Sequence, residues 1–89
     1  MGEDTSFEQQ SPVGTARTLT YGEKAVGLSF NPGGHKQVDA IKTKYAEIID
    51  MMNDFRTEVG QSEAGRLASV AITEAQAAQM WAVKAITWK

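Results

Sequence analysis

The sequence contains no cysteine, two prolines and one histidine among its 89 residues. Without cysteine, neither a disulfide framework nor a thiolate metal site can form. One histidine gives a metal ion no cluster of side-chain ligands, so we expect no metal and no cofactor. A domain this small buries only a modest part of its surface and is marginally stable alone. The lack of covalent or metal crosslinks therefore favours oligomerisation.

Long apolar runs are also missing, so no transmembrane helix is expected. The N-terminal stretch MGEDTSFEQQSP is acidic and polar, unlike a secretory signal, and we expect a cytoplasmic protein. The net charge of -2 argues against binding of duplex nucleic acid, which needs a basic surface, but it is compatible with a small anionic ligand. We interpret residues 1–14 as a flexible arm and residues 15–89 as one helical domain.

Three helices are predicted after the arm. A short one begins near Tyr21, because Thr20 followed by Glu23 matches a capping box, and Asn31-Pro32 should end it. The second shows apolar residues at alternating spacings of 3 and 4, a heptad-like seam: Val38, Ile41, Tyr45, Ile48, Met52, Phe55 and Val59. Its opposite face is charged and should meet solvent: Lys42, Lys44, Glu47, Asp50, Asp54 and Glu58.

Gly60 is a plausible C-cap of the second helix, and Ser62 a plausible N-cap of a third helix that continues to about residue 88. The third helix carries a stripe of alanines flanked by bulky residues on both sides: Ala64, Ala68, Ala71, Ala75, Ala78, Ala82 and Ala85. Its apolar surface is too wide for one partner helix, so other subunits should cover the rest. The predicted fold is all-α, a short N-terminal helix followed by a long antiparallel hairpin that assembles as a homo-oligomer.

Catalysis has little support in the sequence. Glu74 is the one acid deep in the third helix, and the ordinary interpretation is a helix glutamate paired with Lys84, with Arg66 or with a neighbouring chain. A catalytic acid would need a partner base, and none is visible. Trp81 and Trp88 are interpreted as core and interface anchors.

The stretch LSFNPGGHK offers more chemistry. Gly33, Gly34, His35 and Lys36 lie where the second helix begins, and free amides with the positive end of the helix dipole favour anions there. A plain turn between helices is the alternative. Tyr21 is either an ordinary surface or core aromatic or a platform on which a nucleobase stacks. For Arg66, the ordinary role is a salt bridge to Glu63 or to an acid of the second helix.

Two long stretches of the chain resemble the phage anti-CBASS cyclic-oligonucleotide sponges: LTYGEKAVGLSFNPGGHKQVDAIKTKYAEIIDMMNDFR and RLASVAITEAQAAQMWAVKAITWK. The same helical hairpin is shared with the Thoeris anti-defence sponges. The resemblance covers nearly all of residues 19–89 and omits the arm. It implies a compact homohexamer in the cytoplasm of the infected bacterium that sequesters cyclic dinucleotides such as cyclic GMP-AMP without cleaving them, so that the defence effector stays inactive.

The resemblance also implies a site. Tyr21 would stack on a base and Lys36 would meet a phosphate, with the two residues drawn from different protomers. The backbone of the connecting loop would complete the pocket at Asn31, Gly33, Gly34 and His35. Some members hold cyclic trinucleotides in separate pockets, for which Arg66 is the one candidate here. Val38 stands where a polar side chain would be expected to hold a trinucleotide.

Three alternatives stay open at this stage. A structural or protein-binding hairpin would have no affinity for small molecules. A sponge for the cyclic ADP-ribose signals of Thoeris would use the same hairpin. An enzyme that degrades cyclic nucleotides would release new products, but the missing base, nucleophile and metal cluster make this the weakest of the three.

Overall fold

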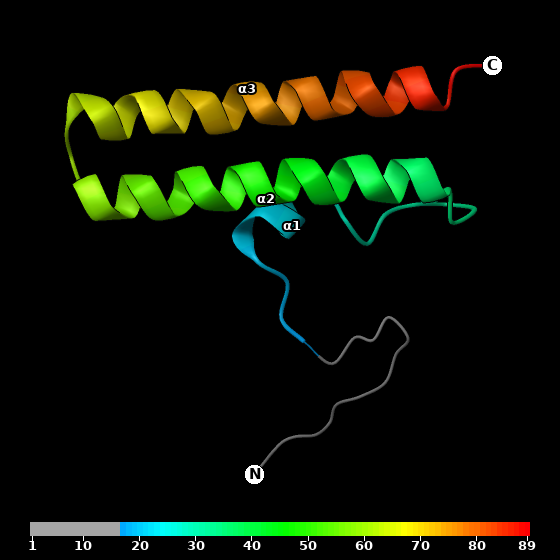
Figure 1. Ribbon diagram of the computed structural model, residues 1–89, viewed down its shortest axis with the longest axis horizontal. Helices are drawn as coiled ribbons and strands as arrows, with labels where there is room; N and C mark the ends of the chain where they lie inside the picture. The colour runs from blue at the N-terminus through cyan, green and yellow to red at the C-terminus, as the bar shows by residue number, and fades with distance from the viewer. Residues whose placement is uncertain (1–16) are drawn as a thin grey trace, which may run out of the picture.

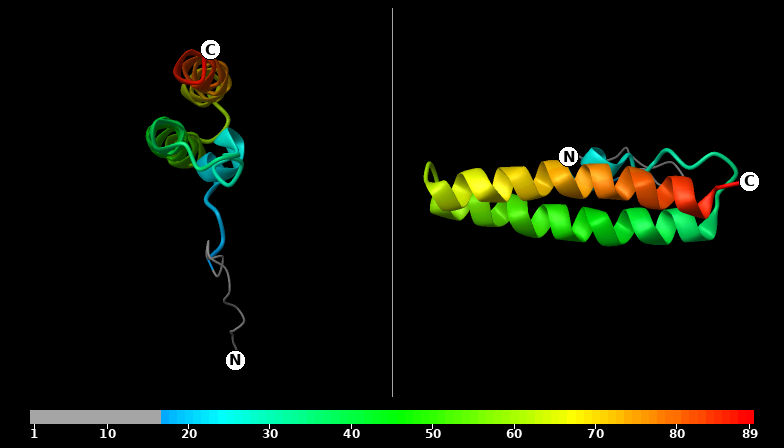
Figure 2. Two further views of the ribbon diagram at one scale, coloured as in Figure 1. Left: turned by 90° about the vertical axis from the view of Figure 1, so that its right-hand side faces the viewer. Right: turned by 90° about the horizontal axis from the view of Figure 1, so that it is seen from above.

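The computed structural model describes residues 17–89, which form the helices α1 (Tyr21–Val26), α2 (Lys36–Val59) and α3 (Glu63–Ile86). α2 and α3 run antiparallel side by side, and α1 packs against α2 (Figure 1). Seen end-on, the three helices lie at the corners of a triangle (Figure 2). The predicted all-helical hairpin with a short preceding helix is therefore confirmed for these residues. The predicted arm, residues 1–14, lies outside them.

Most of the predicted helix ends are confirmed. Thr20 Oγ1 accepts from the Glu23 amide (3.1 Å) while the Glu23 carboxylate accepts from the Thr20 amide (2.9 Å), which is a capping box. Gly60 follows α2, and the Ser62 hydroxyl caps α3 at the Gly65 amide. The end of α1 is a correction: the helix stops at Gly27, four residues before Asn31-Pro32. Gly27 adopts φ 65°, a left-handed conformation that glycine takes without strain.

The core lies where the three helices meet. It is built from Val26 of α1, Ala46 and Ile49 of α2 and Ile72 of α3, and Ile49 is fully buried. α1 can reach this core because Gly22 has no side chain. A Cβ at that position would lie 2.1 Å from the Ala46 carbonyl oxygen, so only glycine allows this approach.

Only part of the predicted apolar seam of α2 is buried within the chain. Ile48 is 51 % exposed and Phe55 is 39 % exposed, whereas Ala46 and Ile49 take the central buried positions. The face that α2 turns toward α1 and α3 is rotated from the seam, since two elements rather than one pack against this helix. Lys42 is a second correction, because it was expected in solvent and is buried.

The alanine stripe of α3 is also divided. Ala68 is buried and Ala75 is half-buried toward the rest of the chain, whereas Ala71 and Ala78 are exposed. Trp81 and Trp88 are about 70 % exposed, so they are not core residues of this chain as the sequence suggested. A search of the helices in residues 17–89 finds none with the length and apolarity needed to cross a membrane.

Candidate functional site

The loop that joins α1 to α2 is held in place by Lys42. The Lys42 ammonium donates to the carbonyl oxygens of Gly27 (3.0 Å) and Phe30, and it lies 5.5 Å from the centroid of the Phe30 ring. Hydrogen bonds from a charged donor are stronger than neutral ones, which compensates for the burial of the ammonium. Lys42 therefore fixes the first half of the loop from within α2, a role that the charge pattern alone did not indicate.

The second half of the loop closes on itself through Asn31 and His35. The Asn31 side chain accepts from the His35 amide (3.2 Å) and donates to the His35 carbonyl (2.9 Å), and the Asn31 carbonyl accepts from the Gly34 amide (2.9 Å). His35 Nδ1 in turn accepts from the Gln37 amide (3.2 Å) and caps α2. The amides at positions 34, 35 and 37 thus already have acceptors within the chain. The charge that this helix start offers to an anion is the exposed side chain of Lys36.

Gly33 and Gly34 both have positive φ angles, 83° and 62°. Nothing lies within 4 Å of the position that a Cβ would take at either residue. Glycine is therefore favoured here by the backbone conformation, and not by the close approach of another part of this chain. Both residues are exposed, so this turn is open to an incoming molecule or to another copy of the chain.

Tyr21 lies well away from this loop, at the first position of α1. The Gly22 amide beside it donates to Asp50 Oδ1 (2.7 Å), and the Tyr21 ring centroid lies 5.3 Å from the guanidinium carbon of Arg56. The ring is 43 % exposed, which leaves part of its surface free to stack. A cation against an aromatic ring also gives the site a positive charge beside a flat surface. Arg56 was not predicted from the sequence, where it was only one residue at the end of a helix.

The distance between Tyr21 and Lys36 decides how they could act together. Asp50 and Arg56, the two contacts of the Tyr21 region, follow Lys36 by 14 and 20 residues along α2. At 1.5 Å per residue they lie about 21 and 30 Å from the start of the helix. Within one chain, the two side chains therefore cannot hold the same compact ligand.

Arg66 lies at the other end of the hairpin, beside a cavity of about 510 Å³ that Arg56, Arg66, Ser62 and Ser69 help to line. Its guanidinium forms a salt bridge with Glu63 (2.6 Å), as the ordinary interpretation predicted. This hydrogen bond holds the pKa of Glu63 below its usual range. Arg56 Nη1 donates to Ser69 Oγ (3.0 Å), so two guanidinium groups and two hydroxyls border one space. Such a set of donors suits an anion.

A second cavity, of about 420 Å³, lies between the α1–α2 loop and the C-terminal end of α3. Its lining combines two exposed aromatic side chains, Phe30 and Trp88, with Lys42 and His35. Val38 also lines it and is buried, so its side chain faces the interior of the chain. No local sequence pattern indicates this cavity, because its walls come from positions more than 40 residues apart.

Comparison with known families gives one match. Residues 23–87 match the family model described as Acb2/Tad1, hairpin domain. The match includes α2, α3, Lys36 and Arg66 and begins two residues after Tyr21. Searches of curated proteins and of solved structures return no match.

Proposed function

Because the chain belongs to the Acb2/Tad1 hairpin family of phage anti-defence sponges for cyclic oligonucleotides, we propose that it sequesters cyclic dinucleotides such as cyclic GMP-AMP in the cytoplasm of the infected bacterium. In this proposal the protein binds the messenger without cleaving it. Its effect is one of mass action, since a bound messenger no longer reaches the effector of CBASS. The family match is the observation that carries this proposal.

The proposed dinucleotide site lies between two copies of the chain. Tyr21 of one copy stacks on a base, and Lys36 of another meets a phosphate. The separation of about 21 to 30 Å within one chain supports this division. Arg56 stays beside Tyr21 and adds a positive charge. Asn31, Gly33, Gly34 and His35 shape the loop next to Lys36.

A homohexamer is the proposed assembly. Two separate apolar surfaces are exposed on the described residues. One, on α2, includes Ile48, Met51 and Phe55, and the other, on α3, includes Trp81. A dimer through one surface would leave the other in water, so a larger closed assembly accounts better for both.

Native mass spectrometry with 3′,3′-cyclic GMP-AMP tests the function. We expect an oligomer that gains whole ligand masses, and chromatography of the denatured complex should return the intact ligand. New products would identify an enzyme instead. An oligomer that gains no ligand from a panel of cyclic GMP-AMP, cyclic triadenylate and cyclic ADP-ribose would leave a structural or protein-binding hairpin. Uptake of cyclic ADP-ribose alone would identify a Thoeris sponge.

A complementation experiment tests the shared site. Tyr21→Ala and Lys36→Ala should each abolish binding, whereas Lys44→Ala, an exposed lysine of the same helix, should not. The two inactive variants are then refolded together, so that mixed oligomers form. Sites with Tyr21 from one variant and Lys36 from the other are intact, and a substantial fraction of the binding should return. If both residues belonged to one chain, the mixture would stay inactive.

A second ligand class is favoured by the cavity at Arg66. We infer that it holds a cyclic trinucleotide, because Arg56, Arg66, Ser62 and Ser69 offer donors to several phosphates. Val38 does not assist, since it is buried at the opposite end of the hairpin. In calorimetry, Arg66→Ala should weaken binding of cyclic triadenylate and leave cyclic GMP-AMP unaffected. Equal affinity of the variant and the parent for the trinucleotide would rule out Arg66.

A further inference from the structure

Three helices meet at the side chain of Arg56, near the end of α2. Its Nε donates to Asn53 Oδ1 in the preceding turn (3.0 Å), and its Nη1 donates to Ser69 Oγ on α3 (3.0 Å). The guanidinium carbon lies 5.3 Å from the centroid of the Tyr21 ring, at the start of α1. Because the guanidinium is planar and its donors are rigidly arranged, two hydrogen bonds fix its orientation as well as its position. The cation is therefore held over one face of the Tyr21 ring.

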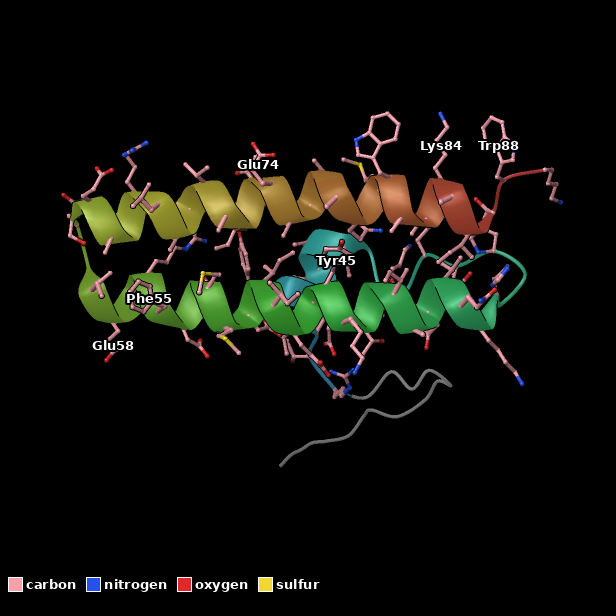
Figure 3. All side chains as sticks on the ribbon, turned by 45° about the horizontal axis from the view of Figure 1, so that its top comes forward. Tyr45, Phe55, Glu58, Glu74, Lys84 and Trp88 are labelled. Atoms are coloured by element: carbon pink, nitrogen blue, oxygen red, sulfur yellow. The ribbon has the colours of Figure 1, made fainter. Side chains whose placement is uncertain are left out.

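The charge of Arg56 is not paired with a carboxylate among residues 17–89, where both salt bridges belong to other arginines. Glu58 follows Arg56 by two residues, and Figure 3 shows it projecting from α2 on the side away from α3. The Arg56 guanidinium instead reaches Ser69 of α3. The positive charge beside the ring is thus not neutralised within this part of the chain.

The other face of the Tyr21 ring is left for a ligand. The side chain is 43 % exposed although Arg56 lies over the ring. The backbone that carries it is anchored, because the Gly22 amide donates to Asp50 Oδ1 (2.7 Å). A flat ligand that stacks on Tyr21 therefore does so opposite the cation.

We propose that Arg56 is a positioning residue that makes the Tyr21 site select guanine over the other bases. This inference rests on the sponge function proposed above and names its preferred ligands, the cyclic dinucleotides that contain guanine. A cation over one face of an aromatic ring draws the π electrons toward itself, so the opposite face becomes poorer in electrons. Stacking on such a face is strongest for the base that is richest in electrons. Guanine is the most easily oxidised of the RNA bases and meets that requirement best.

The expected size of the effect follows from the exposure of the ring. A cation–π contact at an exposed site changes an equilibrium constant by about 2- to 5-fold, and a desolvated one by more. Tyr21 is close to half exposed, so the lower range applies. We therefore expect Arg56 to favour guanine by about 2- to 5-fold for each base that stacks on a Tyr21 ring.

Calorimetric titration with cyclic di-GMP, cyclic di-AMP and cyclic di-UMP tests the selection. The parent should bind cyclic di-GMP most tightly. Arg56→Met, which has a long but neutral side chain, should weaken binding of cyclic di-GMP about 2- to 5-fold more than binding of cyclic di-UMP. Arg56→Lys keeps a charge and should restore part of the preference. The control Lys44→Met removes a charge from an exposed position of the same helix and should change neither the affinities nor their ratios.

The ratio of affinities distinguishes selection from a merely structural role. Equal weakening of all three ligands by Arg56→Met would overturn the inference, and so would a parent that prefers cyclic di-UMP. Circular dichroism of each variant checks that helicity is kept. If Arg56→Met does not fold, Ser69→Ala takes its place, because it frees the guanidinium from α3 and should narrow the preference in the same direction. An unchanged ratio in Ser69→Ala would then overturn the inference.

The same titrations separate this inference from the proposed function. A parent that binds none of the three ligands would overturn the sponge itself. A parent that binds them with a ratio that the Arg56 variants do not change would overturn only the role of Arg56.

Discussion

Replacing Gly22 with alanine should destabilise the protein although alanine is the better helix former. Propensity alone predicts that Gly22→Ala gains about 1 kcal/mol, since glycine is the least favourable ordinary residue inside a helix. The structure predicts the opposite sign. The new Cβ would lie 2.1 Å from the Ala46 carbonyl oxygen and 2.9 Å from its carbonyl carbon, and neither backbone atom can move aside easily.

The magnitude follows from the contacts that α1 would lose. Ordinary contact begins at 3.4 Å, so the helix must withdraw from α2 by more than about 1 Å. The hydrogen bond from the Gly22 amide to Asp50 is then broken, at about 1.5–3 kcal/mol for a charged acceptor. Partial exposure of Val26 costs a further amount of at most about 1.5 kcal/mol. After the gain of about 1 kcal/mol in propensity, the net loss is about 0.5–3.5 kcal/mol, with a middle value of about 2 kcal/mol.

Thermal unfolding followed by circular dichroism gives the assay. A domain of this size loses about 4–8 °C per kcal/mol, so a net loss of about 2 kcal/mol should lower the midpoint by about 8–16 °C. Protomer concentration must be held fixed, since assembly contributes to apparent stability. Lys24→Ala, at an exposed position of α1, is the matched control and should change the midpoint little. A raised or unchanged midpoint for Gly22→Ala would refute the close seating of α1 on Ala46.

Three further predictions concern the loop and the caps. Lys42→Met should lower the free energy of unfolding by about 1–3 kcal/mol because two loop carbonyls lose a charged donor, and the exposed control Lys44→Met should be nearly neutral in the same denaturant titration. His35→Ala should remove about 1 kcal/mol by loss of the N-cap of α2, and His35→Asn should retain it; equal losses in both would show that the cap contributes nothing. The hydrogen bond from Arg17, with that from the Thr20 amide, lowers the pKa of Glu23 to about 2 from 4.5. The stability that this carboxylate contributes is therefore present above about pH 5 and lost as the pH falls toward 2, and hydrogen exchange of α1 should rise over that range in the parent but not in Glu23→Gln.

The sequence was most informative where structure is determined by neighbouring residues. The Thr20–Glu23 capping box, the Gly60 end of α2 and the Ser62 start of α3 each depend on contacts within a few residues, so local pattern was enough to predict them. The hairpin follows from two long amphipathic helices joined by a short turn. The salt bridge between Arg66 and Glu63 is local in the same way.

Predictions from the sequence were wrong where the structure depends on contacts between residues that are far apart along the chain. Lys42 seemed a surface residue, yet it serves the carbonyl oxygens of a loop 12 and 15 residues earlier. Gly22 lowers the helix propensity of α1, yet it is the point where α1 touches α2. Heptad spacing identified α2 and α3 as amphipathic helices, but the buried face of α2 is rotated from the predicted seam onto Ala46 and Ile49. It could not distinguish the part that packs within the chain from the part left exposed, because both obey the same periodicity.

The geometry of the candidate site also could not be predicted from the spacing of its residues in the sequence. Tyr21 and Lys36 are 15 residues apart in the sequence, and this spacing alone does not show whether they lie close together within one chain. The fold separates them, because α1 turns back through the loop and packs near the middle of α2 rather than at its start (Figure 1). In the proposed assembly the neighbouring copy restores the missing half of the site. A ligand that bridges two copies must in turn stabilise the assembly, because it binds the associated form and not the separated chains.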